Sequence, residues 1–365
     1  MKIAIMGIRG IPANYGGFET FAEELSTRLV NKGHKVTVYG RSNTIDYKEP
    51  YYKGVRIVIL PTIGHKYLDT VVHTPLCVFH ALKERYNVIL ICNSANAIYT
   101  WIPRVFGTPV ALNVDGLEWK RAKWSIVGQW YYKISEWLAT FMASVIVTDA
   151  RDIEKYYFKK FKKVSRFIPY GAPVEKVKTK EALDKFGVEP NKYILYVSRF
   201  EPENNPHLIV QAFEKTKTDF KLVMVGDAPY SSNFIKKLKN TKDPRIIFTG
   251  YVFGKGYREF QSHAYFYVQA TEVGGTHPAL LEGMGYGNCI LATDVPEQRE
   301  VLGDAGFFFN QTVNGELTKM MQYLLDNPKV VEDAGQKSVK IIEENYTWQH
   351  VADAYENLFI QLNKN

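Results

Sequence analysis

The sequence has few of the features that mark exported, disulfide-stabilised or membrane-spanning chains. Its three cysteines, Cys77, Cys92 and Cys289, are far apart and fit neither a disulfide framework nor a metal-binding spacing. No run of about eighteen apolar residues occurs, so we expect no transmembrane helix. Residues 2–7 read as a strand and do not have the architecture of a signal peptide. We therefore expect a protein of the reducing cytoplasm.

The signatures of several cofactor- and nucleic-acid-binding classes are also missing. The glycine-rich segment 7–19, GIRGIPANYGGFE, has neither the G-x-G-x-x-G spacing of dinucleotide-binding proteins nor the lysine of a P-loop. The eight histidines show no ligand pattern, and no nucleic-acid motif accompanies the basic residues. These absences disfavour a nicotinamide-dependent oxidoreductase, a metal site and a nucleic-acid partner. The missing signal peptide disfavours an exported, non-catalytic sugar-binding protein.

Positive charge is present but unevenly distributed. The formal net charge is +8, and residues 1–173 contain 24 Lys and Arg against 13 Asp and Glu, whereas the rest contains 22 against 25. Two stretches, 119–137 and 155–163, combine these cations with Trp, Tyr and Phe. That combination suits the headgroup level of an anionic bilayer and predicts peripheral contact with a membrane surface. A solvated basic helix face with core aromatics is the alternative.

Strand-like and helical segments alternate along the whole chain. A helix with apolar residues every four positions is expected at 19–33, between the first two strands. The continuous apolar strands predict two successive α/β domains, each a doubly wound parallel sheet covered by helices. The Pro/Gly-rich turn at 168–173 marks the boundary between domains 1–173 and 174–346. The expected strands are 2–7, 35–39, 55–60, 88–92, 109–113 and 145–148, then 193–198, 221–226, 245–250, 265–269 and 289–293.

The glycine pair Gly16 and Gly17 stands just before the first expected helix. Glycine lets the backbone approach a ligand closely, and free amides at a helix start favour anionic groups. Ligands also gather at this edge of α/β sheets. We expect ligand contact here, with a simple connecting turn as the alternative.

The segment 272–287, EVGGTHPALLEGMGYG, predicts a second helix start at a ligand edge. Pro278 stands where the first helical turn tolerates proline. The amides of Gly275, Thr276 and His277 would then be free for a diphosphate or a sugar hydroxyl. Glu282 follows about one turn later among apolar neighbours, as an acceptor for sugar hydroxyls or as a solvent-facing carboxylate.

Three further polar residues are expected at strand ends. Arg199, in VSRFEPENNPH, follows the first strand of the second domain and suits bidentate phosphate binding, with a surface salt bridge as the alternative. Asp115 follows the strand at 109–113, either to bind an acceptor or donor hydroxyl or as an Asp-Gly turn residue. Asn93 is a weaker candidate at another strand end of the same edge.

Taken together, these motifs resemble the retaining glycosyltransferases of family 4. The resemblance rests on YVSRFEPENNPHLIVQAF, VGDAP, IIFTGYV, GGTHPALLEGM, IPYGAP and YTWQHVADAYENLF, and it covers essentially the whole chain. Within that family, GIRGIPANYGGFET and EVGGTHPALLE look like bacterial rhamnosyltransferases of capsule, rhamnan and cell-wall polysaccharide assembly. The resemblance implies the GT-B fold, with two facing Rossmann-like domains, an active site between them, and a C-terminal helix, 347–365, that crosses back onto the first domain.

The resemblance also implies roles for individual residues. Arg199 would hold the donor diphosphate, Glu282 the ribose hydroxyls, and Gly16 with Gly17 would close over the diphosphate. Tyr251 and Val252 match the segment that reads the pyrimidine base. Two departures stand out: the family's first glutamate is replaced by Gly274, and the lysine that often follows the arginine is replaced by Asn204. Both departures disfavour glucosyl or mannosyl transfer.

The expected reaction is therefore transfer of L-rhamnose from dTDP-L-rhamnose to a lipid-linked saccharide at the inner face of the cell membrane. The resemblance implies that no metal or other cofactor is needed. Two alternatives remain open within the same fold: a transferase that uses a UDP-sugar such as UDP-glucose or UDP-N-acetylglucosamine, and a sugar-nucleotide epimerase.

Overall fold

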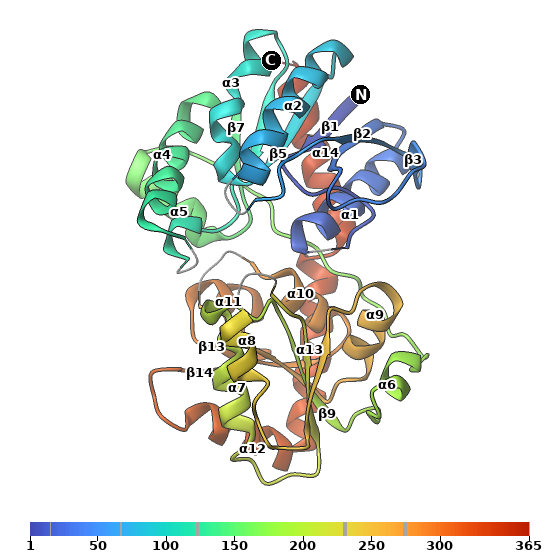
Figure 1. The fold of residues 1–365 in the computed structure, drawn as a ribbon, viewed down its shortest axis with the longest axis vertical. Coiled ribbons are helices and arrows are strands. Elements are labelled where there is room, and N and C mark those ends of the chain that lie inside the picture. Colours follow the sequence, from blue (N-terminus) through green and yellow to red (C-terminus); the bar gives the residue numbers. More distant parts are fainter. Residues whose placement is uncertain (15, 66–67, 122–123, 229–231, 273–275, 365) are drawn as a thin grey trace. The chain divides into compact units, whose positions relative to one another are not determined.

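The computed structural model describes residues 1–365 except 15, 66–67, 122–123, 229–231, 273–275 and 365. The chain folds into two compact units, each an α/β structure (Figure 1). Unit 1 comprises Met1–Tyr170 together with Trp348–Asn365, and unit 2 comprises Gly171–Thr347. The last helix of the chain therefore belongs to the unit that the first residues form.

Unit 1 is built on an eight-stranded sheet that is parallel except at one edge pair. Each central strand is a short apolar run buried on both faces, as expected for a sheet with helices on either side. The strands, in their order across the sheet, are β3 (Tyr51–Tyr52), β4 (Val55–Leu60), β2 (Lys35–Arg41), β1 (Lys2–Met6), β5 (Val88–Cys92), β6 (Val110–Asn113), β7 (Val145–Thr148) and β8 (Arg166–Phe167).

The helices of unit 1 follow the strands in alternation. The α-helices are α1 (Gly17–Asn31), α2 (Leu68–Glu84), α3 (Trp101–Val105), α4 (Ile126–Met142), α5 (Arg151–Phe161) and α14 (Trp348–Lys364), and the 3-10 helices are η1 (Ser94–Tyr99) and η2 (Glu118–Lys120). One buried cluster joins β1, β5 and β6 to α2, α4 and α5 through residues such as Met6, Ile91, Leu112 and Ala139. This cluster fixes the positions of the strand ends.

Helix α14 packs against α1 and closes unit 1. Its apolar face is buried, and the ring of Tyr355 lies 5.3 Å from that of Phe21. After the end of α1, Lys32 forms ion pairs with two carboxylates of α14, at 2.5 Å to Asp353 and 2.6 Å to Glu356. The apolar face of α14 is therefore buried within unit 1.

Unit 2 contains a fully parallel six-stranded sheet. Its strands, in order, are β11 (Ile246–Gly250), β10 (Lys221–Val225), β9 (Tyr193–Val197), β12 (Phe266–Gln269), β13 (Cys289–Thr293) and β14 (Gly306–Phe309). Its helices are α6 (Glu181–Lys185), η3 (Pro202–Asn204), α7 (Pro206–Phe213), α8 (Ser232–Leu238), α9 (Gly254–His263), α10 (Pro278–Gly285), α11 (Pro296–Leu302), α12 (Glu316–Asp326) and α13 (Pro328–Asn345).

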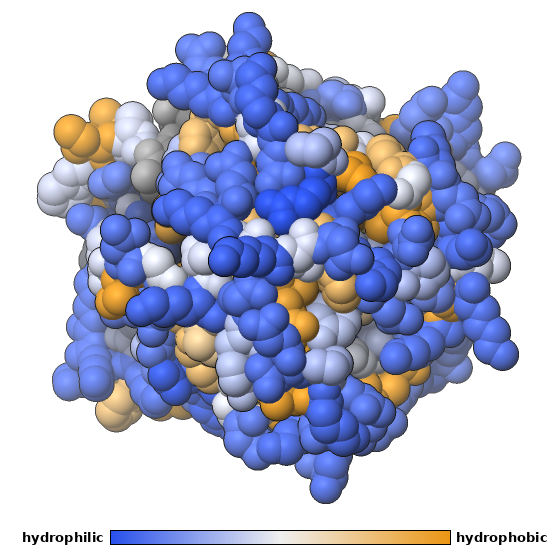
Figure 2. Space-filling model, turned by 90° about the horizontal axis from the view of Figure 1, so that it is seen from below, coloured by the Kyte–Doolittle hydropathy of each residue, from blue (hydrophilic) through white to orange (hydrophobic). Residues whose placement is uncertain are grey.

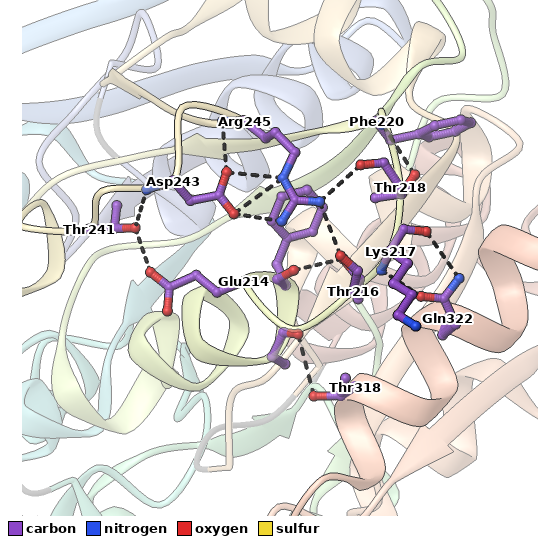
Figure 3. A network of polar contacts seen from close by, with 12 residues as sticks. Glu214, Thr216, Lys217, Thr218, Phe220, Thr241, Asp243, Arg245, Thr318 and Gln322 are labelled. Atoms are coloured by element: carbon purple, nitrogen blue, oxygen red, sulfur yellow. Dashed lines mark hydrogen bonds and ion pairs between the residues drawn. The ribbon is translucent and has the colours of Figure 1, made fainter.

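A polar network at the amino end of β11 fastens the edge of the unit 2 sheet that lies opposite the carboxyl ends of its strands (Figure 3). Arg245 donates to Asp243 from Nε at 3.0 Å and from Nη2 at 2.6 Å. Its Nη1 donates to the carbonyls of Thr216 and Thr218, at 3.1 and 2.9 Å. The guanidinium lies 4.8 Å from the ring centre of Phe213. One arginine thus ties α7, the following turn and β11 together.

Hydrophilic residues cover most of the face in Figure 2, and apolar residues form only small separate groups there. None of the helices among the described residues has both the length and the apolar character needed to span a bilayer.

The structure confirms the predicted fold class of two parallel-sheet α/β domains. Each strand expected from an apolar run is present within one or two residues of its predicted bounds. The short strands β3 and β8 and the edge strand β14 were not predicted.

Candidate functional site

In open α/β sheets, ligands bind beyond the carboxyl ends of the strands, where the strand order reverses. That point lies between β9 and β12 in unit 2 and between β1 and β5 in unit 1. The predicted site residues that the structure describes follow the carboxyl ends of these strands and their neighbours or stand at the start of the next helix. Each unit therefore has its own candidate ligand edge.

Arg199 follows β9 directly at the unit 2 edge, in a segment held by hydrogen bonds. The side chain of Asn204 donates from Nδ2 to the carbonyl of Arg199 at 2.7 Å, and Tyr196 donates to the carbonyl of Asn204 at 2.8 Å. Nη1 of Arg199 lies 3.7 Å from Oε1 of Glu201. Asn204 is buried, so its amide group positions the Arg199 backbone in this structure.

Gly226, at the end of the neighbouring strand β10, allows the chain before Arg199 to pack closely against it. Its φ is +138°, and a Cβ there would lie 1.9 Å from the carbonyl oxygen of Ser198. Only glycine combines this backbone with so close an approach. The Arg199 segment is thereby fixed on both of its sides.

Helix α10 begins where the sequence predicts, with His277 as its N-cap and Pro278 in the first turn. The amides of Leu280 and Leu281 both donate to the carbonyl of His277, at 3.0 and 3.2 Å. Thr276, just before the helix, is buried. The start of α10 carries the positive end of the helix dipole. Gly275, the remaining predicted residue of this turn, lies outside the described residues.

Glu282 is held by a tyrosine that the sequence did not single out. Tyr257, on α9, donates its hydroxyl hydrogen to Oε2 of Glu282 and accepts a bond of 2.9 Å from Nε2 of Gln261. Burial, and next the Glu282 carboxylate, raise the pKa of Tyr257 well above its usual value. The phenol therefore stays protonated and keeps the Glu282 carboxylate in one orientation. Because the two residues are 25 positions apart, no local pattern points to this contact.

Two exposed aromatic rings follow β11 at the same edge. The rings of Tyr251 and Phe253 lie 5.8 Å apart with an interplanar angle of 13° and are 42% and 46% exposed. Val252 between them is half-buried. Parallel exposed rings offer a stacking surface for a flat ligand such as a nucleobase. Phe253 was not among the predicted site residues.

At the unit 1 edge, two glutamates of α1 hold the glycine-rich segment. Oε1 of Glu19 accepts the amide of Arg9 at 3.0 Å, and Oε2 of Glu23 accepts the amide of Ala13 at 2.9 Å. Gly16 is the N-cap of α1 and Gly17 its first residue. Burial raises the pKa of Glu19 above its usual value. The sequence analysis singled out neither glutamate: Glu19 is the last residue of the glycine-rich segment, and Glu23 follows one turn later on α1.

Asn93 follows β5 at the same edge and caps η1. Its backbone has a φ of 75°, and its Oδ1 accepts the amide of Ala95 at 2.9 Å. The backbone amide of Asn93 donates to the carbonyl of Asn113 at 2.8 Å. These bonds fix the turn that follows β5.

Asp115 is positioned through a chain of bonds that begins on the last helix. Tyr355 accepts a bond of 3.0 Å from Nδ2 of Asn113, whose Oδ1 accepts the amide of Asp115 at 3.1 Å. Tyr170 lies 3.5 Å from Oδ1 of Asp115. Asp115 has a φ of 58° and is half-buried. Helix α14 therefore helps to position the backbone of Asp115, the carboxylate residue that the sequence singled out.

Asn93 and Asp115 thus share the carboxyl edge of unit 1, and Arg199, Tyr251, His277 and Glu282 share that of unit 2. No group of three or more His, Cys, Asp or Glu side chains that could hold a metal ion occurs among the described residues. The two edges instead offer amides, a guanidinium, carboxylates and aromatic rings. This chemistry suits an anionic ligand with hydroxyl groups and a flat base.

Two family models match the chain, one for each half. Residues 1–173 match a domain of unknown function, DUF1972, and residues 191–327 match the glycosyl transferases group 1. The division between the two models lies close to the boundary between the two units.

Curated relatives match only part of the chain. N-acetyl-alpha-D-glucosaminyl L-malate synthase of Bacillus anthracis is 24% identical over 181 residues, which are 48% of this chain and 47% of that protein. A Campylobacter jejuni enzyme, N-acetylgalactosamine-N,N'-diacetylbacillosaminyl-diphospho-undecaprenol 4-alpha-N-acetylgalactosaminyltransferase, is 25% identical over 128 residues, or 34% of each chain. The chain thus matches less than half the length of either relative.

Solved structures match the whole chain in fold. Anabaena Alr3699/HepE in complex with UDP and glucose is 14% identical, with a TM-score of 0.80 over 99% of this chain and 100% of that chain. The chain therefore has the GT-B fold, and its residues 191–327 match the model of the glycosyl transferases group 1.

Proposed function

We propose that the chain is a retaining glycosyltransferase that transfers L-rhamnose from dTDP-L-rhamnose to a lipid-linked saccharide in bacterial surface polysaccharide synthesis. The observation that carries a nucleotide-sugar donor is the unit 2 edge, where Arg199, the start of α10 and the Tyr257–Glu282 pair follow strands of one sheet. Each group matches one part of such a donor.

The diphosphate binds the cationic groups in this proposal. Arg199 presents its guanidinium, and the amides of Thr276 and His277 add the positive end of α10. Glu282 accepts the hydroxyls of the pentose, and Tyr251 with Val252 lies along the pyrimidine base. Catalysis then rests on these fixed donors, which stabilise the charge that grows on the departing diphosphate, and needs no metal.

The reaction breaks the bond between the sugar's anomeric carbon and the diphosphate oxygen. A hydroxyl oxygen of the acceptor forms the new bond on the same face of the sugar, and its proton passes to the leaving diphosphate. Asp115, at the unit 1 edge, is proposed to bind a hydroxyl of the acceptor or of the transferred sugar.

The rhamnose donor is supported by the residues around position 274. Gly274 stands where the family carries a hexose-binding glutamate, so that carboxylate is missing. The nearest carboxylate, Glu272, accepts a bond of 2.6 Å from Nδ2 of Asn205, at the start of α7. This bond gives Glu272 a structural contact and disfavours its use as a replacement ligand for hexose hydroxyls.

A lipid-linked acceptor is supported by one relative and by the charge of unit 1. The Campylobacter jejuni relative is named for a diphospho-undecaprenol substrate. Residues 1–173 have an excess of cations, and those in 119–137 and 155–163 stand among aromatic residues. We therefore place the protein in the cytoplasm, in peripheral contact with the anionic inner face of the cell membrane.

A UDP-sugar donor is the second candidate. It is favoured by the Anabaena protein of the same fold, which was solved with UDP and glucose. Glu282 does not separate the two because deoxyribose retains the 3′-hydroxyl that a carboxylate would bind.

Thermal unfolding with dTDP, UDP and GDP tests the proposal. A nucleotide that binds only the folded chain stabilises it by about 2.7 kcal/mol at a hundred times its dissociation constant. We expect dTDP to raise the melting temperature most. A larger shift with UDP supports the second candidate, and no shift with any of the three contradicts the donor site. An epimerase would instead convert the sugar nucleotide without any acceptor.

A further inference from the structure

Helix α4 presents a row of large apolar side chains to solvent. We call this row the apolar ridge; each member is between 48% and 79% exposed, and it consists of Ile126, Val127, Trp130, Ile134, Trp137 and Phe141. Their spacing of three or four residues places them on one face of the helix. At 1.5 Å per residue, this face is about 25 Å long.

The apolar ridge continues onto the end of α3. Nη1 of Arg104 donates to the carbonyls of Phe141 and Met142, at 2.8 and 2.7 Å, which joins the two helix ends. Val105 and Phe106, beside that arginine, are both 70% exposed. An exposed apolar surface of this extent marks an interaction site, because soluble surfaces rarely expose contiguous apolar patches.

The charges around the apolar ridge are mainly positive. The only carboxylate of α4, Glu136, is buried and bonded to Tyr156 of α5 at 2.7 Å. Helix α5 and its end carry six cations against two carboxylates between residues 151 and 163. Lys133 and Lys160, one from each helix, lie over the same ring of Trp119, at 4.8 and 5.8 Å. Figure 1 shows the two helices on one side of unit 1.

We propose that the apolar ridge of α4 inserts into the headgroup and upper acyl region of an anionic bilayer, with the lysines of α5 at the phosphates. Tryptophan favours this depth, and cations beside an apolar helix face match an anionic lipid surface. A second copy of this chain would bring the same cations against each other, so charge favours the lipid as the occupant.

The buried side of α4 links this surface to the unit 1 ligand edge. The helix packs against η1 and η2, and Tyr131 donates to the carbonyl of Ala95 at 2.8 Å. Asn93 caps η1, and Asp115 precedes η2. A docked α4 therefore holds this edge near the headgroups, where a lipid-linked acceptor presents its diphosphate; that last step rests on the proposed function.

Flotation of the full chain with vesicles tests the docking. We expect binding to vesicles of phosphatidylcholine with phosphatidylglycerol and at least tenfold weaker binding for the double variant Trp130→Glu/Trp137→Glu. Val313→Glu, which adds a charge at an exposed apolar residue of unit 2, is the matched control and should bind normally. The variant Lys159→Gln/Lys162→Gln should lose binding to the anionic vesicles, and salt should weaken binding of the unchanged chain.

Circular dichroism and the melting temperature show whether each variant folds. The dTDP-induced rise in melting temperature should be the same in the ridge variant and the unchanged chain, because the ridge belongs to unit 1 and the proposed donor residues belong to unit 2. Loss of vesicle binding with that shift intact supports the proposal even if transfer is never observed. Equal flotation of the ridge variant and the unchanged chain overturns it, as does a ridge-dependent dimer that binds no vesicles.

Discussion

At the scale of single residues, the ligand edge of unit 2 contains groups whose orientation is set by their neighbours. Asn204 holds the backbone of Arg199, and Tyr257 holds the carboxylate of Glu282. Motif spacing led to Arg199 and Glu282 because each stands in a short characteristic run. It did not lead to Tyr257, because a contact between α9 and α10 has no signature in either segment.

Replacement of Arg199 by Ala should strongly lower the turnover number, kcat. A fixed donor to growing charge is worth about 2.7–4 kcal/mol of barrier, so kcat should fall by about 100-fold to 1000-fold. Steady-state kinetics with the preferred sugar nucleotide measures this. Lys340→Ala, an exposed cation of α13, is the control and should leave kcat unchanged. Unchanged turnover in Arg199→Ala would remove the phosphate role from this residue.

The substitution Tyr257→Phe should weaken donor binding and leave the fold intact. It keeps the ring but removes the bond to Glu282, and hydrogen bonds to charged groups contribute about 1.5–3 kcal/mol. Calorimetric titration should show an approximately tenfold or larger rise in the nucleotide's dissociation constant. Tyr323→Phe, on α12, is the matched control. Equal affinities would show that the orientation of Glu282 does not matter for the donor.

At the scale of elements, the apolar runs were enough to predict the central strands, since each is buried on both faces. The runs at β3 and β8 are only two residues long, and the Phe-rich β14 lies at the edge of its sheet. Short strands and edge strands form because a neighbouring strand pairs with them. A local sequence pattern does not contain that neighbour. The sequence predicted a surface role for 119–137 from its cations and aromatic residues, and the structure shows which apolar side chains of α4 face solvent.

The bond between α14 and β6 should contribute to the stability of unit 1. Tyr355→Phe keeps the ring against Phe21 but leaves Nδ2 of Asn113 without its acceptor. A buried group left unpaired costs about 1–3 kcal/mol, so the free energy of unfolding should fall by that amount. Chemical denaturation measures the change. No loss of stability would show that α14 holds Asn113 by packing alone.

The Arg245 network predicts a pH dependence. The Arg245 guanidinium holds the pKa of Asp243 below its usual value, and this outweighs the opposing effect of burial. The resulting stabilisation is present above the unfolded pKa of about 3.9 and is lost as the pH falls through the lower folded value. Arg245→Met should destabilise the chain at neutral pH and lose less stability than the unchanged chain below pH 4. Parallel losses in both chains would contradict this coupling.

At the scale of the whole molecule, the two units have separate ligand edges and opposite charge balance. The excess of cations in residues 1–173 accompanies an exposed apolar helix face, whereas residues 174–365 have a slight excess of carboxylates. This division is what a transferase needs if its acceptor is anchored in a membrane and its donor is soluble.

Transfer of a labelled sugar measures the proposed reaction itself. The full chain would be incubated with dTDP-L-rhamnose labelled in the sugar, together with membranes that contain lipid-linked saccharides. We expect label to enter the lipid-extractable fraction with retained anomeric configuration, and we expect Arg199→Ala to reduce this incorporation by about 100-fold or more. The proposed function would be contradicted if the label stayed water-soluble with both dTDP-L-rhamnose and UDP-sugars. It would also be contradicted if the chain altered the donor in the absence of an acceptor.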